Sequence, residues 1–320
     1  MASGHSDSHL PGGLAPRDAA RITRRVAMLS VSTALVLMAL KFWAWMQSGS
    51  VALLSSLADS GLDGMASLFT LIAVTYAAKP PDEEHRYGHG KAEAFAALVQ
   101  ALLVGVSATL IALEAIERFR MPQPLEATGL ALVVMGLSIA LTVALIVAQT
   151  LAVRRTGSVA TQGDRAHYAA DLAANAAVIA GIGGAALTGQ TWIDPAVGLA
   201  LALWLAWSAV DVARGGWDQL LDRELPDAAR DRIRSLALAP GGLLDIHQLR
   251  TRASGPYVHI QFHADLPPGL SLIEAHHLMV AAEASILTEF PAADVIIHPD
   301  PRGHAEVHGS ETFREDQAAQ

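Results

Sequence analysis

Two pairs of ionisable side chains, each spaced by four residues, lie inside stretches of sequence that are otherwise apolar. Asp59 and Asp63 form the first pair, and His167 and Asp171 form the second. On an α-helix, residues four apart lie on one face, so each pair directs its ligand atoms at one place. Three carboxylates and one imidazole are a suitable donor set for a divalent cation, and we expect the four side chains to form one metal site.

A less specific interpretation of each pair has to be weighed against this one. An aspartate near a helix end can act as a cap, and a histidine on an apolar helix face is more often a satisfied core residue than a ligand. However, a charged side chain at bilayer depth costs at least about 2.5 kcal/mol and usually faces a water-filled cavity or a partner. The matched spacing of the two pairs therefore favours a metal site.

The composition indicates a membrane protein. Of 320 residues, 52% are hydrophobic and only 17% are charged, and the mean hydropathy is +0.34. The chain has no cysteine, so any metal must be held by His, Asp or Glu. Residues 216–320 carry 8 basic and 16 acidic side chains, which argues against nucleic acid as a partner and suits a cationic one.

Six stretches are long and apolar enough to predict transmembrane helices. They lie at about residues 26–46, 51–78, 92–117, 125–153, 166–187 and 193–213. Most of the basic residues between them fall on the side of the N-terminus. The positive-inside rule therefore predicts that both termini are cytoplasmic.

The pattern of the chain predicts an α-helical membrane protein with a small α+β cytoplasmic domain. We expect a disordered lead at 1–16, a six-helix transmembrane domain at 17–215, a small cytoplasmic α+β domain with candidate metal ligands at 216–301 and a flexible tail at 302–320. In the cytoplasmic domain, helices at about 226–239 and 271–289 and strands at 244–252, 257–264 and 294–298 give the order α-β-β-α-β. Glu274 follows Ser271 by three residues, which predicts a capping box at the second helix.

A second candidate metal site lies between the second and third predicted helices. Asp82, His85 and His89 offer one oxygen and two nitrogen ligands within one short segment. The alternative, weighed evenly, is a solvated loop whose charges only cap the next helix.

A third candidate group lies in the cytoplasmic domain, where five potential ligands come from different strands and a helix. They are His247, His263, His276, His298 and Asp300. Scattered surface histidines are the alternative, again weighed evenly. Four residues of strand place His259 about 13 Å from His263, too far to share an ion. His277 points elsewhere on its helix, and we expect His304 and His308 to be solvated.

Several motifs also carry a family resemblance. They are the two four-residue pairs, the segments Gly88-His89-Gly90-Lys91-Ala92-Glu93 and Leu220-Leu221-Asp222-Arg223, and the segment from Asp294 to Pro301. Together with six predicted spans, they make residues 17–301 similar to the cation diffusion facilitator family. Within that family the chain most resembles the bacterial homodimeric zinc and ferrous-iron efflux transporters.

The resemblance implies roles that the spacing alone does not show. It implies that the two membrane pairs bind the transported Zn2+, Cd2+ or Fe2+, and that the loop group is a second site. It also implies that the cytoplasmic group holds regulatory ions at the interface of a homodimer in the bacterial inner membrane. A salt bridge between Lys91 and Asp222 is implied to fasten the membrane and cytoplasmic parts. The additional His259 and His277, with the acidic Glu83-Glu84, depart from the family pattern.

The donor set itself favours a metal/proton antiporter rather than an enzyme. An imidazole among carboxylates shifts the preference from Mg2+ and Mn2+ toward Zn2+, Cd2+ and Fe2+. Metal binding requires His167 to be neutral, so loading releases protons and protonation releases metal. The alternatives are a membrane-anchored metal sensor, which needs no carboxylates in the membrane, a passive channel, which needs no proton counterflow, and an intramembrane metallohydrolase, which no His-Glu-x-x-His motif supports.

Overall fold

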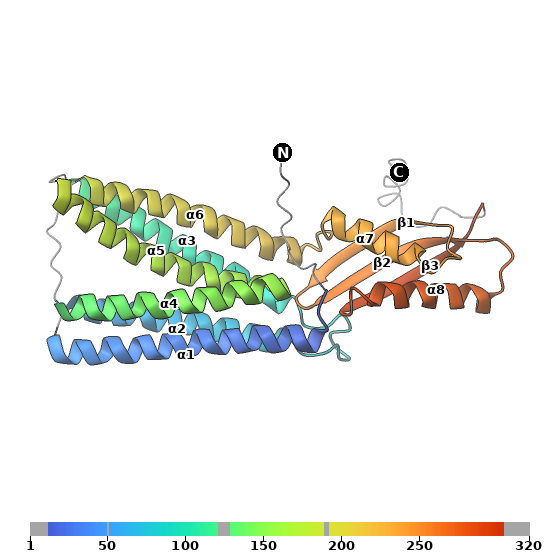
Figure 1. Cartoon of the computed structure of the whole chain (residues 1–320), viewed down its shortest axis with the longest axis horizontal. Coiled ribbons are helices and arrows are strands. Elements are labelled where there is room, and N and C mark those ends of the chain that lie inside the picture. The colour runs from blue at the N-terminus through green and yellow to red at the C-terminus, as the bar shows by residue number, and fades with distance from the viewer. Residues whose placement is uncertain (1–11, 50, 121–128, 189–191, 304–320) are drawn as a thin grey trace.

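The computed structural model describes residues 12–49, 51–120, 129–188 and 192–303. Most of the predicted lead (1–16) and tail (302–320) therefore lies outside the described residues. In Figure 1, a bundle of long helices extends along the molecule, and a small α/β domain continues beyond one end of it.

Six long helices form the bundle. They are α1 (Pro16–Ser48), α2 (Val51–Ala77), α3 (Ala92–Arg120), α4 (Gly129–Thr156), α5 (Val159–Thr188) and α6 (Ile193–Leu220). Five of them, all except α5, are long and apolar enough over their described residues to cross a membrane. The structure thus contains a helical membrane domain with at least five candidate spans, and a sixth crossing by α5 stays a prediction.

The ends of two helices differ from the sequence-based prediction. Helix α6 continues to Leu220 rather than ending near Ala213, and it passes through Gly215 and Gly216 without a break. A Cβ on Gly216 would lie 2.9 Å from the Ala94 carbonyl oxygen, so this glycine allows α6 to pack closely on α3 rather than ending the helix. Helix α5 begins at Val159, which places His167 in its third turn instead of at its start.

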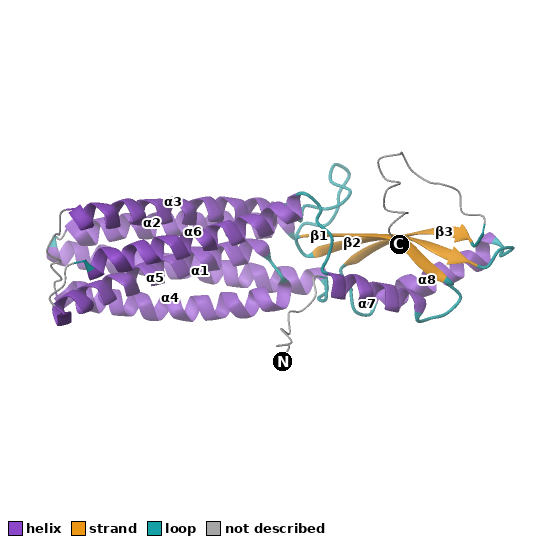
Figure 2. Ribbon diagram, turned by 90° about the horizontal axis from the view of Figure 1, so that it is seen from above, coloured by secondary structure: helices purple, strands orange, loops and turns teal. Residues whose placement is uncertain are grey.

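The α/β domain has the predicted α-β-β-α-β order. Its elements are α7 (Asp227–Leu238), β1 (Asp245–Ser254), β2 (Tyr257–Leu266), α8 (Leu272–Leu287) and β3 (Ala293–Pro301). Strand β2 lies in the centre of the sheet, antiparallel to β1 and parallel to β3. In Figure 2, the sheet is seen edge-on and both helices lie on one side of it.

The alternating direction of the side chains along the strands explains which face of the sheet the helices cover. On β2, Val258, Ile260 and Phe262 are buried, and they pack in one core with Ile233 of α7 and Ile286 of α8. Side chains of the intervening residues therefore point to the opposite, helix-free face. The predicted capping box starts α8: the backbone N–H of Glu274 donates to Ser271 Oγ, while the Glu274 carboxylate accepts from the Ser271 backbone.

The segment between α2 and α3 joins the membrane domain to the α/β domain. A Cβ on Gly90 would lie only 1.9 Å from the Ser254 carbonyl oxygen, so the backbone of Gly90 packs directly on the tip of the β1–β2 hairpin. Close by, Lys91 Nζ lies 3.0 Å from Asp222 Oδ1, and Arg252 lies 3.1 Å from the other oxygen of the same carboxylate. The two parts of the chain therefore meet through a close backbone contact and a small ion-pair network.

Candidate metal centres

Three of the four predicted membrane ligands meet between α2 and α5. One ligand atom each of Asp63, His167 and Asp171 lies within 4.8 Å of the others. His167 Nε2 is 3.0 Å from Asp63 Oδ1 and 3.9 Å from Asp171 Oδ2. Asp171 Oδ2 is buried and makes no hydrogen bond among the described residues. A dication at this point would receive two carboxylate oxygens and one imidazole nitrogen, which is a chemically suitable partial coordination shell.

Asp59 lies outside this three-donor group. It is one turn before Asp63 on α2, and its side chain is exposed. The α-helical spacing places both carboxylates on one face of α2, but α5 lies opposite the turn of Asp63. We designate Asp63, His167 and Asp171 the membrane group and treat Asp59 separately.

A buried hydrogen-bond network lies one turn from the membrane group and was not anticipated from the sequence. Its centre is Asp164 on α5, which is 1% exposed and accepts hydrogen bonds from Ser67 of α2 at 3.1 Å and from Gln149 of α4 at 2.8 Å. Tyr168 donates to the Ser30 carbonyl of α1 at 3.1 Å, and Gln149 also donates to the Ser30 hydroxyl. Four helices are therefore tied together beside His167 by polar contacts.

Lys41 of α1 is a second residue that the sequence analysis did not single out. Its ammonium donates to Ser60 Oγ at 2.6 Å and to the Ser56 carbonyl at 3.1 Å, both on α2. It is the one charged residue in the otherwise apolar stretch 26–46, and that isolation is the sequence signal that could have identified it. Asp164 offers a weaker signal, since it stands three residues before His167 but has the polar neighbours Gln162 and Arg165.

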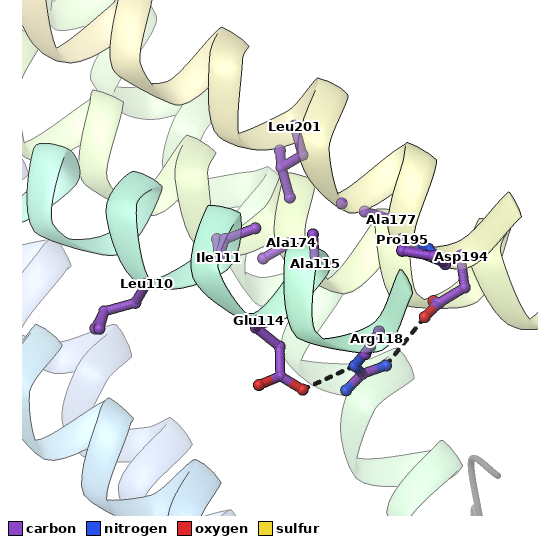
Figure 3. Close-up of a pocket in the computed structure, with 11 residues that line it drawn as sticks. Leu110, Ile111, Glu114, Ala115, Arg118, Ala174, Ala177, Asp194, Pro195 and Leu201 are labelled. Carbon is purple, nitrogen blue, oxygen red and sulfur yellow. Dashed lines mark hydrogen bonds and ion pairs between the residues drawn. The ribbon is translucent and has the colours of Figure 1, made fainter. Parts of the chain in front are cut away.

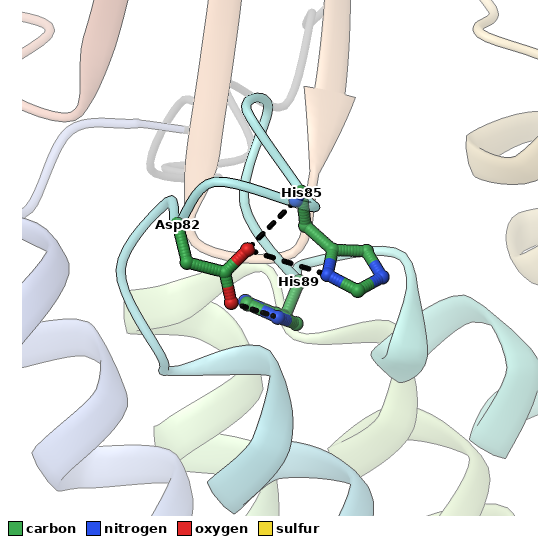
Figure 4. Close-up of side chains that lie close together, drawn as sticks. All are labelled: Asp82, His85 and His89. Carbon is green, nitrogen blue, oxygen red and sulfur yellow. Dashed lines mark hydrogen bonds and ion pairs between the residues drawn. The ribbon is translucent and has the colours of Figure 1, made fainter.

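The loop residues Asp82, His85 and His89 also form a compact group, shown in Figure 4. Asp82 Oδ1 lies 3.4 Å from His85 Nδ1, and Asp82 Oδ2 lies 3.2 Å from His89 Nε2. Hydrogen bonds from the backbone of His85 and then Glu84, with the nearby imidazoles, hold the pKa of Asp82 below its usual value. His89 Nδ1 is buried without a hydrogen-bond partner among the described residues, so the loop group has a ring nitrogen available as a metal ligand.

The third group lies on the sheet. His247 of β1, His263 of β2 and His298 of β3 occupy paired positions in the strand register. Asp300 brings them together: its carboxylate is 2.8 Å from His263 Nδ1, 3.4 Å from His247 Nε2 and 3.5 Å from His298 Nε2. We call these four residues the sheet group. Three of them, His247, His263 and Asp300, place ligand atoms within 4.8 Å of one another.

His276, predicted as a fifth cytoplasmic ligand, does not join the sheet group within one chain. It lies exposed on α8, beside His277. Helix α8 covers one face of the sheet, whereas the alternation of the strands directs His263 to the other face. Sequence spacing gives no information on this choice of face, because it depends on which way the helices fold back.

His259, the additional strand histidine, serves the domain junction. It is buried and lies 3.3 Å from Asp294, and the ring of Tyr87 from the α2–α3 segment meets it edge-on. Burial lowers the pKa of His259, and the hydrogen bond with Asp294 opposes this only in part. The predicted separation of His259 from His263 agrees with their different contacts.

A cavity of about 430 Å³ lies between α3, α5 and α6, and Figure 3 shows the residues that line it. Its charged lining residues form ion pairs with one another, since Arg118 donates to Glu114 at 2.8 Å and to Asp194 at 3.1 Å. Most of the remaining lining is apolar, including Ala174 and Leu201. The cavity therefore provides no cluster of available metal ligands, in contrast to the membrane group.

Comparisons with known proteins bear on both parts of the chain. Residues 27–221 match the family described as cation efflux transmembrane domain, and residues 225–302 match the family described as cation efflux protein, cytoplasmic domain. The chain is 38% identical over 283 residues to the cation-efflux pump FieF of Klebsiella pneumoniae, covering 88% of this chain and 93% of that protein. It is 41% identical over 272 residues to FieF of Shewanella oneidensis, covering 85% and 92%. A solved chain of CzrB in its Zn form is 31% identical and covers 27% of this chain, with a TM-score of 0.25.

Proposed function

The chain belongs to the cation efflux family, whose members are membrane transporters rather than enzymes, and from this premise we propose that it exports Zn2+, and also Cd2+ or Fe2+, in exchange for protons. The observation that carries the proposal is the membrane group. Asp63 and His167 are 104 residues apart in the sequence, and Asp63 Oδ1 lies 3.0 Å from His167 Nε2 within the helical bundle. Intramembrane ionisable residues that converge in this way are characteristic of ion pathways.

We propose that Asp59 supplies the fourth ligand. Its exposed position, one turn from Asp63, suits a residue that meets the ion as it enters or leaves. Two or three carboxylates provide most of the charge that attracts a dication, and the His167 imidazole shifts selection toward borderline metals such as Zn2+.

Proton exchange follows from the chemistry of the same donors. Metal binding requires a neutral imidazole and ionised carboxylates, so loading releases protons from the group and protonation displaces the metal. In the proposed cycle, metal enters from the cytoplasm and displaces protons, and the loaded group is exposed to the other side. There protons displace the metal, and the protonated group returns.

We propose that the cytoplasmic domains pair two copies of the chain in the bacterial inner membrane, with both termini cytoplasmic. The support is the match of residues 225–302 to the family's cytoplasmic domain and the exposed position of His276. A ligand that turns away from its own sheet is available to a site shared with a second copy. The sheet group and the loop group are then regulatory or stabilising sites rather than parts of the pathway.

Transport by purified protein in proteoliposomes tests the function. We expect Zn2+ flux driven by an imposed pH gradient in the wild type, and no flux above that of empty liposomes for Asp63→Asn. Asp231→Asn, which alters an exposed carboxylate on α7, is the matched control and should transport normally. Equal flux with and without the pH gradient would contradict proton exchange, and wild-type flux from Asp63→Asn would contradict the site.

A further inference from the structure

Lys41 places an ammonium group beside the ligand-bearing turns of α2. Among the described residues, it donates hydrogen bonds to two groups of α2, the Ser56 carbonyl and the hydroxyl of Ser60, which is 1% exposed. Ser60 directly follows Asp59 and precedes Asp63 by less than one turn. The amine is half-buried in a helix that is otherwise apolar at this depth.

Among the described residues, Lys41 forms no direct ion pair, and its ammonium donates to serine oxygens. Its charge acts through space on Asp63, Asp171 and Asp59. These are the three carboxylates assigned to the transported ion. An unneutralised cluster of carboxylates is costly in a medium of low dielectric constant, and a fixed cation nearby reduces that cost.

We propose that Lys41 is a fixed counter-cation of the transport site. Its positive charge lowers the affinity of the site for the metal and so speeds metal release. The proposal rests on the proposed function and adds a residue that sets the balance between affinity and turnover. A fixed positive charge stabilises the metal-free site, because there it offsets only negative charge. It stabilises the loaded site much less, because there the dication already offsets most of the same negative charge.

A purely structural role would have a different consequence. Lys41 also connects α1 to α2 through its two hydrogen bonds, and loss of such a contact alone would loosen the site and weaken metal binding. Removal of the charge without loss of the fold should instead tighten metal binding. The direction of the change in affinity therefore separates the two roles.

The experiment measures Zn2+ transport and Zn2+ affinity for Lys41→Met, Lys41→Gln and Lys41→Arg. For the Met and Gln variants we expect the KM for Zn2+ and the Kd from chelator competition to fall about tenfold or more, with a lower maximal rate because release is slowed. Lys41→Arg keeps the charge and should stay close to the wild type. Arg154→Met removes an equal charge from the exposed last turn of α4, a helix that carries none of the proposed ligands, and is the matched control.

Two further variants keep the result interpretable. Ser60→Ala removes the hydrogen bond but leaves the charge, and it should not tighten metal binding. Introducing Asp63→Asn into Lys41→Met should abolish the gain in affinity, which assigns that gain to the membrane group rather than to the loop or sheet groups. The proposal is overturned if Lys41→Met and Lys41→Gln both bind Zn2+ no more tightly than the wild type. Failure of the wild type to transport in the same liposomes would instead count against the proposed function.

Discussion

The membrane group and the sheet group use the same kinds of ligand but differ in what surrounds them. The membrane group contains one imidazole and two carboxylates, with a third carboxylate and an ammonium nearby. The sheet group contains three imidazoles around one carboxylate, and His298 is open to solvent. Neutral imidazoles can be left without metal at little electrostatic cost, whereas several carboxylates inside a membrane cannot.

Under the proposed function, this difference assigns exchange of metal ions to one group and their retention to the other. In the membrane group, the release of metal must be accompanied by another positive charge, and protons are the available substitute. The sheet group has no such requirement, and paired positions on three hydrogen-bonded strands hold its ligands in place. Exchange is therefore expected where the carboxylates are, and retention where the histidines are.

The largest expected effect comes from removing the imidazole of the membrane group. His167→Gln should lower Zn2+ transport at least about hundredfold, since loss of a direct ligand exceeds the loss caused by an outer-shell partner. Zn2+ bound to the sheet group should remain, as measured by metal content after gel filtration. His277→Gln is the control and should leave transport unchanged. Near-normal transport by His167→Gln would remove the distinction drawn here between the two groups.

The reciprocal change is expected to affect binding rather than transport. Asp300→Asn should weaken Zn2+ binding to the sheet group about 10–100-fold, because its carboxylate contacts all three histidines. Competition with a chelator on the purified full-length protein measures this loss, and Asp231→Asn serves as the control. Transport at saturating Zn2+ should stay within about a factor of two, since the two groups share no residues. Complete loss of transport would show that the sheet group belongs to the pathway.

A substitution at the domain junction tests how the two regions are connected. Gly90→Ala should destabilise the protein by about 1–3 kcal/mol, because the new Cβ meets the carbonyl oxygen of Ser254 and the backbone has to move. Thermal unfolding of the detergent-solubilised protein measures the loss. Gly136→Ala in α4, where the added Cβ meets no atom within 4 Å, is the control and should be neutral or slightly stabilising. An unchanged melting temperature for Gly90→Ala would contradict the close backbone contact.

The smallest expected effect concerns the ion pairs of Asp222 at the same junction. Burial alone would raise the pKa of Asp222, but the hydrogen bond from Lys91 and the charge of Arg252 outweigh it and lower the pKa. A lowered carboxylate pKa contributes stability that is present above the unfolded-state pKa of about 3.9 and is lost as pH falls through the folded-state value.

Since this carboxylate is partly exposed, its contribution should not exceed about 1 kcal/mol. Asp222→Asn should therefore lower the melting temperature slightly at pH 7, and the difference from the wild type should shrink as pH falls below about 4. A difference that grows on acidification would contradict the assigned direction. Asp218→Asn, which removes a similarly exposed carboxylate paired with Arg223 near the same helix end, provides the comparison.

Much of the membrane group was accessible from the sequence because helical periodicity is reliable over one turn. The four-residue spacing put His167 and Asp171 on one face of a helix, and the structure brings Asp63 close to both. The same spacing could not say which turn of α2 would lie opposite α5, since this depends on the relative height of two helices. For that reason Asp59 was expected in the group but lies outside it.

Other features depend on long-range packing that a local pattern does not encode. Whether Gly216 ends a helix or allows a close helix contact depends on α3, which precedes it by more than a hundred residues. Whether His276 faces the sheet group depends on the face that α8 covers. The roles of Lys41 and Asp164 depend on partners from other helices, although the isolation of Lys41 in apolar sequence was itself a signal.

The hydrogen-bond network around Asp164 has a consequence for how an ion is received. Because Asp164 and Tyr168 of α5 are bonded to α1, α2 and α4, a rotation of α5 about its axis by even one residue would break these bonds together. The orientation of His167 is thus settled when the protein folds, before any metal arrives. Under the proposed function, an incoming dication therefore meets an imidazole that is already oriented, and its binding free energy is not reduced by the cost of ordering the helix that carries His167.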